Sequence, residues 1–351
     1  MVAVLDPELK VRRVESRRDR ERFLKLPWSL YATNPAWVPP LLALQRDRLS
    51  PRANPYFRHA DVALFLAERS GRVVGRISAQ VCQLVQQHHG HGIGHFGMCA
   101  CADNAVTAEA LFDAASDWLR TRGMTRVMGP FDLSINDETG MLVEGFDDPP
   151  YVMMGHHHSY YSALLEDVGF VKEMDVFAYR GDVSKPYDLR LDRLVQRATG
   201  DGRIKLRQIS RKNRSQELRR VLEVFKDGWS ENWGYVPPTE AEVDRLVRHL
   251  RRLLDRGIVT IADVDGEDAG FMVVLPNLNE VITDLNGRLF PFGWLKLLWR
   301  LRFAQFDSLR IPLMGIRKQH QGTRVGASVA ISMIDSCRKT LLRQGAQRCE
   351  M

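Results

Sequence analysis

The chain has 351 residues, of which 44% are hydrophobic, and its 50 Lys and Arg residues against 43 Asp and Glu residues give a formal charge of +7. This length suits two domains better than one core, and the apolar share excludes a disordered chain. The basic balance favours an anionic partner, such as a phosphorylated cofactor, an anionic membrane surface or nucleic acid, although a solvated basic face needs no partner.

The first half of the chain predicts an α/β unit that begins with helices. The motif NPAWVPP (34–40) follows a charged, helix-like run. The stretch 61–81 is typical of two strands joined by a tight turn at Ser70-Gly71. A strand, a helix, a strand, a short helix and a closing hairpin are predicted next, at 94–102, 107–121, 125–131, 160–169 and 169–181.

The second half repeats this pattern. WSENWGYVPP (229–238) again places tryptophans before a Val-Pro-Pro. The next run carries apolar residues at helical spacing from Val243 to Leu254. Residues 259–277 then repeat the two strands, with their turn at Asp265-Gly266. The shared element order and turn chemistry predict that one folding unit is used twice.

The predicted domains are an N-terminal domain at 1–182 and a C-terminal domain at 204–351, joined by a charged linker at 183–203 that contains two glycines. The C-terminal domain is expected to open with a strand at 204–210 and to carry another at 308–316, followed by a long helix. By comparison with the first copy, this second domain is expected to be incomplete at its C-terminal end.

The stretch QGTRVGA (321–327) lies between a predicted strand and that long helix. Its glycines let the backbone turn sharply and leave amide N–H groups uncovered. Because the first N–H groups of a helix lack internal partners and lie at the positive end of its dipole, they can bind phosphate. Arg317, Lys318 and Arg324 add positive charge. The stretch is neither a P-loop nor a dinucleotide fingerprint, and an ordinary tight turn is the alternative interpretation.

This element order and loop resemble the GNAT acyltransferase fold, an α/β fold with a mixed sheet. In that superfamily an Arg/Gln-x-x-Gly-x-Gly/Ala loop binds the pyrophosphate of acyl-CoA. Gln321 and Gly326 match the pattern, whereas Arg324 stands at the fixed glycine. The corresponding stretch of the first copy, CADNAVTAEA (101–110), is acidic and lacks glycine. The resemblance therefore implies CoA binding by the second copy, and a role of the first copy in shaping the acceptor site.

Four longer segments resemble a bacterial tandem-GNAT family that includes bacterial ceramide synthases: 34–40, 129–150, 160–170 and 285–298. The chain departs from the family pattern at Met98-Cys99-Ala100-Cys101, where the family has an aromatic and acidic stretch. The resemblance implies an N-acyltransferase that uses acyl-CoA as cosubstrate. The acceptor would be a small-molecule amine or a lipid amine such as a sphingoid base.

The resemblance also assigns cofactor binding to the strand end and the loop: Met314, Gly315, Ile316, Arg317, Gln321, Gly322, Thr323, Arg324, Val325, Gly326 and Ala327. In the GNAT mechanism the amine attacks the thioester directly, and backbone N–H groups near the first three of these residues would polarise the thioester carbonyl.

Candidate catalytic groups are concentrated in DLSINDETGMLVEGFDD (132–148). Acyl transfer needs a group that removes a proton from the amine, and a carboxylate can do so. We rank Glu138 first and Asn136 second, and Asp284 is the comparable candidate in the second copy. Asp- and Asn-rich turns also satisfy their own backbone, which is the structural alternative for this segment.

Histidines cluster at 88–95, near two cysteines, and at 156–158. Neither cluster has the ligand spacing of a zinc site, so no metal is predicted. A Cys-His nucleophile would require spatial information that the sequence lacks. The five cysteines are scattered and imply no disulfide framework, which favours the cytoplasm.

Residues 287–306 (GRLFPFGWLKLLWRLRFAQF) combine aromatic, aliphatic and basic residues. Burial of this helix in the core or between domains is one interpretation. The other is peripheral contact with the inner membrane surface, with the cations facing anionic headgroups. No apolar run is long enough to cross a bilayer.

Three alternative functions stay open at this stage. They are a non-catalytic tandem-GNAT binding protein, an N-acetyltransferase of small amines, and a basic protein associated with nucleic acid. No nucleic-acid-binding motif is present, and basic residues are spread along the chain, so no nucleic-acid partner is predicted.

Overall fold

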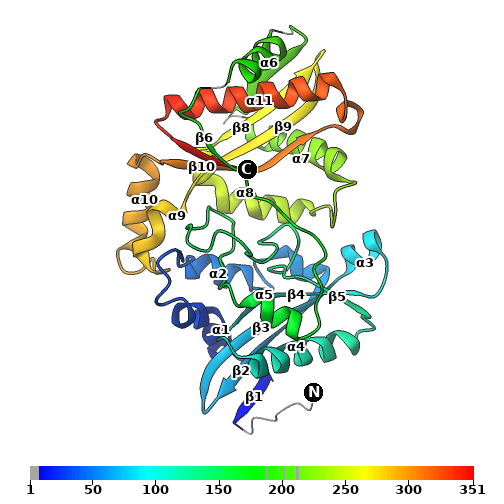
Figure 1. Cartoon of the computed structure of the whole chain (residues 1–351), viewed down its shortest axis with the longest axis vertical. Coiled ribbons are helices and arrows are strands. Elements are labelled where there is room, and N and C mark those ends of the chain that lie inside the picture. The colour runs from blue at the N-terminus through cyan, green and yellow to red at the C-terminus, as the bar shows by residue number, and fades with distance from the viewer. Residues whose placement is uncertain (1–7, 187, 201, 211–212) are drawn as a thin grey trace. The chain divides into compact units, whose positions relative to one another are not determined.

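The computed structural model describes residues 8–186, 188–200, 202–210 and 213–351. The chain forms two compact units (Figure 1). Unit 1 comprises Met1–Val176, Pro238–Arg245 and Ile282–Gly293, and unit 2 comprises Phe177–Pro237, Leu246–Val281 and Trp294–Met351. Each unit is built around one sheet.

The sheet of unit 1 has the order β1-β2-β3-β4-β5. Its first three pairings are antiparallel and the last is parallel. Ser70 and Gly71, at φ +48° and +76°, form the predicted tight turn between β2 and β3. The strands are Leu9–Arg13, Ala60–Arg69, Arg72–Cys82, Ile93–Cys101 and Arg126–Met128.

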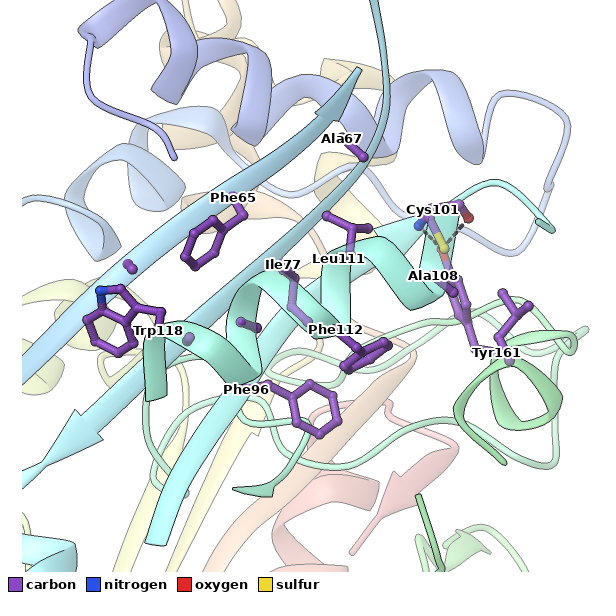
Figure 2. Close-up of a cluster of buried hydrophobic side chains, with 14 of the residues drawn as sticks. Phe65, Ala67, Ile77, Phe96, Cys101, Ala108, Leu111, Phe112, Trp118 and Tyr161 are labelled. Carbon is purple, nitrogen blue, oxygen red and sulfur yellow. Dashed lines mark hydrogen bonds between the residues drawn. The ribbon is translucent and has the colours of Figure 1, made fainter. Parts of the chain in front are cut away.

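Helix α4 (Ala105–Arg120) covers this sheet and buries one apolar face. Leu111 and Phe112 of that face pack in one core cluster with Ile77 and Phe96 of the strands (Figure 2). The other helical elements of unit 1 that lie before Val176 are α1 Arg17–Leu30, α2 Leu42–Arg48, η1 Pro55–Arg58, α3 Gln83–His89 and α5 Tyr161–Asp167.

Unit 2 repeats the same sheet. Its order is β6-β11-β10-β9-β8-β7, and the four pairings from β7 to β11 have the same directions as those from β1 to β5. Asp265 and Gly266, at φ +53° and +93°, form the matching tight turn. The predicted duplication is therefore confirmed. The strands are β6 Arg180–Asp182, β7 Ile204–Gln208, β8 Ile258–Val264, β9 Glu267–Pro276, β10 Ser308–Ile316 and β11 Arg348–Glu350.

Helix α11 (Arg324–Arg343) takes the place in unit 2 that α4 has in unit 1, between the last two strands of the repeat. Val329, Met333, Cys337 and Leu341 recur every fourth residue and are buried in the core of this unit. The remaining helical elements are α6 Leu189–Thr199, α7 Arg214–Trp229, α8 Glu240–Leu254, α9 Asn279–Ile282, η2 Thr283–Leu285, α10 Gly293–Phe303 and η3 Lys318–His320.

The predicted hairpin at 169–181 is wrong. Arg180–Asp182 instead forms β6, which adds to the sheet of unit 2 by antiparallel pairing with β11. The predicted linker at 183–203 contains α6, which begins at the N-cap Asp188 and packs on α11. Linker residues 187 and 201 lie outside the described residues. The many charged residues of this stretch led to the linker prediction, but α6 is an amphipathic helix that buries Val195 and Ala198.

Both sheets carry an irregularity on the strand that leads into the long helix. Between the pairs Arg76↔Ala100 and Ser78↔Gly97, β4 has one residue more than β3. Likewise β10 has one residue more than β9 between Arg310 and Leu313. The parallel pairing with the next strand is limited to residues 93–95 of β4 and 308–310 of β10. Beyond these residues the two parallel strands no longer pair.

Within the described part of the chain, no helix has both the length and the apolar character that crossing a membrane requires.

Candidate active site

The glycine loop, residues 317–326, connects β10 with α11. Thr323 is the N-cap of α11, and its Oγ1 atom accepts a hydrogen bond of 3.0 Å from the N–H of Gly326. A Cβ atom at Gly326 would lie 2.0 Å from the carbonyl oxygen of His320, so a side chain at this position would force the loop apart. Gly322 has a φ of +69°. Both glycines are thus required by the backbone path.

The beginning of α11 is open. Residues 321–324 are exposed, and among the described residues no protein acceptor is recorded for the N–H groups of Gly322, Arg324 and Val325. These groups lie at the positive end of a helix of 20 residues. The arrangement can bind an anion with several oxygen atoms.

The three cationic side chains of the loop differ in whether hydrogen bonds or ion pairs hold them in place. Arg317 donates from Nε to the carbonyl oxygen of Asp268 at 2.6 Å, and Lys318 pairs with Glu231 at 2.7 Å. The side chain of Arg324 is exposed and has no ion-pair partner among the residues the structure describes. Arg324 is therefore the loop cation with most freedom to bind an incoming phosphate.

Three consecutive residues at the end of α7, here called the α7 brace (Asp227, Gly228 and Trp229), hold the loop in place. Asp227 Oδ2 accepts from the N–H of Lys318 at 3.0 Å. The carbonyl oxygen of Gly228 accepts from Gln321 Nε2 at 2.8 Å. The indole N–H of Trp229 donates to the carbonyl oxygen of residue 314 at 3.0 Å. Sequence reasoning missed the brace, because nothing local to it signals a contact with a loop some 90 residues away.

In unit 1 the equivalent part of β4 is covered by its own chain. The N–H of Phe131 bonds to the carbonyl oxygen of Phe96 at 2.8 Å, and Asp132 Oδ1 accepts from the N–H of Met98 at 2.9 Å. A Cβ at Gly97 would lie 1.7 Å from the carbonyl oxygen of Phe131. Chain 129–132 thus lies against β4 where β5 no longer pairs with it.

In unit 2 no such segment is present among the described residues. Beyond Arg310, the backbone groups of residues 311–316 have no recorded backbone hydrogen bonds except those of the β9–β10 pairing. Trp229 and Gln321 donate to two carbonyl oxygens of this stretch, those of Met314 and Ile316. We call residues 311–316 the open edge of β10. The two copies therefore share a fold but differ at the edge that leads to the loop.

The acidic segment of unit 1 surrounds Arg48. The guanidinium lies 2.9 Å from Glu138 Oε1, 3.3 Å from Asp132 Oδ2 and 4.0 Å from Asp137 Oδ1. Burial disfavours the charged form of Glu138, yet the charge and hydrogen bond of Arg48 outweigh it and lower the pKa of this carboxyl. Burial, together with repulsion from Glu138, raises the pKa of Asp132 to about 6. The neighbouring carboxyls of Glu138 and Asp132 therefore have pKa values shifted in opposite directions.

The three predicted catalytic residues all lie in unit 1, whereas the glycine loop lies in unit 2. Glu138 is bound by Arg48, and Asn136 is exposed in a turn whose N–H bonds to Ser134 Oγ. Asp284 is exposed in η2. Close to it in sequence, Asn286 Oδ1 accepts from Trp28 Nε1 at 2.7 Å, which ties this segment to α1.

No sequence pattern predicted a second side-chain cluster of unit 1. His59 Nδ1 lies 3.4 Å from Cys82 Sγ, and His59 Nε2 lies 3.3 Å from Glu242 Oε1. Glu242 is fixed by Thr239, whose N–H and hydroxyl both donate to it. Cys82 is buried, and the three residues belong to segments far apart in the chain.

Comparison with known proteins identifies the family. No protein-family model matches the chain. The chain is 44% identical over 345 residues to the protein named bacterial ceramide synthase of Caulobacter vibrioides. This match covers 98% of this chain and 90% of that protein. The chain belongs to the bacterial ceramide synthase family of GNAT-fold N-acyltransferases.

The chain is also 38% identical over 344 residues to Protein YghO of Escherichia coli, and the match covers 97% of this chain and 87% of that protein. Solved structures confirm the tandem fold. A tandem GNAT protein from the clavulanic acid biosynthesis pathway matches 98% of this chain and 89% of its own with a TM-score of 0.50 at 14% identity. A GCN5-related N-acetyltransferase from Anabaena variabilis matches 97% of this chain and 65% of its own, also with a TM-score of 0.50, at 9% identity.

Proposed function

We propose that this chain transfers an acyl group from a CoA thioester to the amino group of a long-chain lipid amine of the sphingoid-base type. The observation that carries the proposal is the 44% identity, over nearly the whole chain, to a protein named bacterial ceramide synthase. The open glycine loop of unit 2 adds physical support, because it offers free amides and a cation where the fold would hold a pyrophosphate.

In this proposal acyl-CoA binds to unit 2. The pyrophosphate accepts hydrogen bonds from the N–H groups of Gly322, Arg324 and Val325, and the Arg324 guanidinium adds charge. The pantetheine arm follows the open edge of β10, where the strand has no partner on the side of β11. Unit 1 does not bind CoA, because its own chain occupies the equivalent edge.

The chemistry proceeds in one displacement. The neutral amine attacks the thioester carbonyl, and backbone N–H groups at Met314, Gly315 or Ile316 stabilise the oxyanion. The C–S bond then breaks, and the thiolate of CoA takes a proton. The products are the amide and free CoA, and the proton lost by the amine is accepted by a general base or by water.

The acidities in unit 1 suggest separate roles for its carboxylates. Glu138, whose pKa is lowered, stays ionised near neutral pH and suits attraction of the acceptor ammonium. Asp132, whose pKa is raised to about 6, accepts from the N–H of Met98 and pairs with Arg48, so it suits holding chain 129–132 on β4. We therefore propose Glu138 as the first candidate for the base, with Asn136 and Asp284 as further polar groups that bind the acceptor.

The proposed acceptor is a long-chain lipid amine, which partitions into bilayers. We therefore also propose peripheral membrane contact through residues 287–306. A small-amine N-acetyltransferase and a non-catalytic binding protein are the competing functions.

The test measures CoA thiol release from acyl-CoA of several chain lengths, with sphingoid bases and with small polar amines as acceptors. We expect release to depend on a long-chain amine. Release with small polar amines alone would favour the competing transferase, and saturable CoA binding without release would favour the binding protein.

A matched pair of variants ties the activity to the glycine loop. Gly326→Ala should abolish CoA binding, because its Cβ would lie 2.0 Å from the carbonyl oxygen of His320. Gly202→Ala is the control, because a Cβ there meets nothing within 4 Å. Unchanged CoA affinity in a folded Gly326→Ala protein would contradict the proposed site.

A further inference from the structure

Helix α10 presents an aromatic face to solvent. Leu295, Trp299 and Phe303 recur every fourth residue and are 48%, 62% and 62% exposed. We call these three residues the aromatic face. On the opposite side of the helix, Leu297 and Leu301 are each 9% exposed. The helix is thus anchored on its protein by one side and leaves large apolar side chains uncovered on the other.

Cations border this face on both sides. At 100° per residue, Arg302 and Lys296 lie on either side of the line from Leu295 to Phe303, and both are exposed. The Arg302 guanidinium lies 5.4 Å from the centroid of the Phe303 ring. Residues 287–306 contain four Lys or Arg residues and neither Asp nor Glu. The charged residues of this stretch of chain are therefore all basic.

Two further aromatic side chains precede the helix in the chain. Phe290 and Phe292 are 86% and 73% exposed. Within α10 itself the Trp299 and Phe303 rings are neighbours, with centroids 5.9 Å apart. Exposed aromatic groups of this size are unfavourable in water, and such a pair marks an interaction surface. The exposed fractions of Leu295, Trp299 and Phe303 show that the aromatic face is not part of the core of unit 2.

We propose that the aromatic face lies on an anionic lipid bilayer, with Trp299 and Phe303 at the level of the acyl chains and Lys296 and Arg302 against lipid phosphates. A tryptophan-containing apolar face with cations on both of its sides is the pattern of an interfacial helix. The 11 residues of α10 are too few to cross a bilayer, so the helix lies in the surface. The inference rests on this surface and not on the acyl transfer, and it would bring the enzyme to a lipid acceptor.

The experiment is flotation of the full chain with vesicles of phosphatidylcholine alone or mixed with phosphatidylglycerol. We expect binding to the anionic vesicles, weakened by salt because surface charges are screened. The double variant Trp299→Ser/Phe303→Ser should bind at least tenfold more weakly. Lys296→Glu/Arg302→Glu should also bind tenfold or more weakly, since each cation contributes roughly fivefold.

Phe177→Ser is the matched control, because Phe177 is 70% exposed but lies outside α10. It should bind as the unchanged chain does. All variants change exposed residues, and their thermal unfolding is measured to show that they are folded. Absence of binding to anionic vesicles at low salt, or equal binding of the aromatic double variant, would overturn the proposal.

Self-association is the main competing use of the face. Size-exclusion chromatography with light scattering that finds a dimer, lost in Trp299→Ser/Phe303→Ser, without vesicle binding would overturn the membrane proposal in favour of a second copy. CoA release with a sphingoid base dispersed in detergent micelles, without vesicles, is measured in parallel. Vesicle binding by a chain that releases no CoA would refute the proposed function while leaving this inference intact.

Discussion

A Cβ atom at Gly228 would lie 2.4 Å from the carbonyl oxygen of Ile316. The end of α7 therefore touches the last residue of β10, next to the glycine loop. Gly228→Ala must push the two elements apart, at a cost of about 1–3 kcal/mol. We expect CoA affinity to fall roughly tenfold or more, because the loop is displaced.

Isothermal titration with CoA measures that change. Gly202→Ala, with open space around the new Cβ, is the control. A folded Gly228→Ala protein with unchanged CoA affinity would show that the α7 brace does not position the loop.

Arg324 is expected to strengthen CoA binding through its positive charge and not by holding the conformation of the glycine loop. Arg324→Ala is expected to weaken CoA binding roughly threefold to tenfold at low salt, and less at high salt, because its side chain is exposed and screened. Arg343→Ala, at the other end of α11, is the control and should change little. Titrations at two salt concentrations measure both effects, and an effect of Arg324→Ala that does not depend on salt would argue against a direct phosphate contact.

Arg48 holds three carboxylates together in unit 1. Arg48→Met leaves Asp132, Asp137 and Glu138 without their shared cation, so the free energy of unfolding should fall by about 3–5 kcal/mol. Urea unfolding at two pH values measures the loss. The loss should be smaller at lower pH, where the carboxyls take up protons. Arg46→Met, which removes an exposed pair with Glu21, should cost about 1 kcal/mol or less.

The contact of His59 with Cys82 and Glu242 predicts a pH dependence of stability. Burial favours the neutral ring, but hydrogen bonds to Cys82 and Glu242 raise the pKa of His59 to about 9. Since the folded state binds the proton more tightly, this stabilisation is complete below the unfolded pKa of about 6.5 and is lost as pH rises through about 9.

Thermal unfolding between pH 6 and pH 10 measures this slope. His59→Gln should flatten it, whereas His88→Gln, at an exposed position, should leave it unchanged. Identical slopes for His59→Gln and the unchanged chain would refute the assigned role of His59.

The duplication could be predicted because its signals are local. The turn at Ser70-Gly71 and the turn at Asp265-Gly266 each require positive φ within two residues, and the structure has both. The family could be predicted from segments spread along the chain, and the comparison with bacterial ceramide synthase confirms it. The predicted cofactor and catalytic residues stay proposals.

The sequence by itself determined the repeated unit, its tight turns and the amphipathic helix that carries Val243 to Leu254, because these depend on backbone preferences and periodicity within a few residues. Tertiary structure alone decided that β6 joins the sheet of unit 2, that Asp132 meets β4 of unit 1, and that the α7 brace holds the glycine loop. Each of these depends on which distant residues meet. Such contacts are fixed by packing and hydrogen bonding of the whole chain, and no local sequence pattern predicts them.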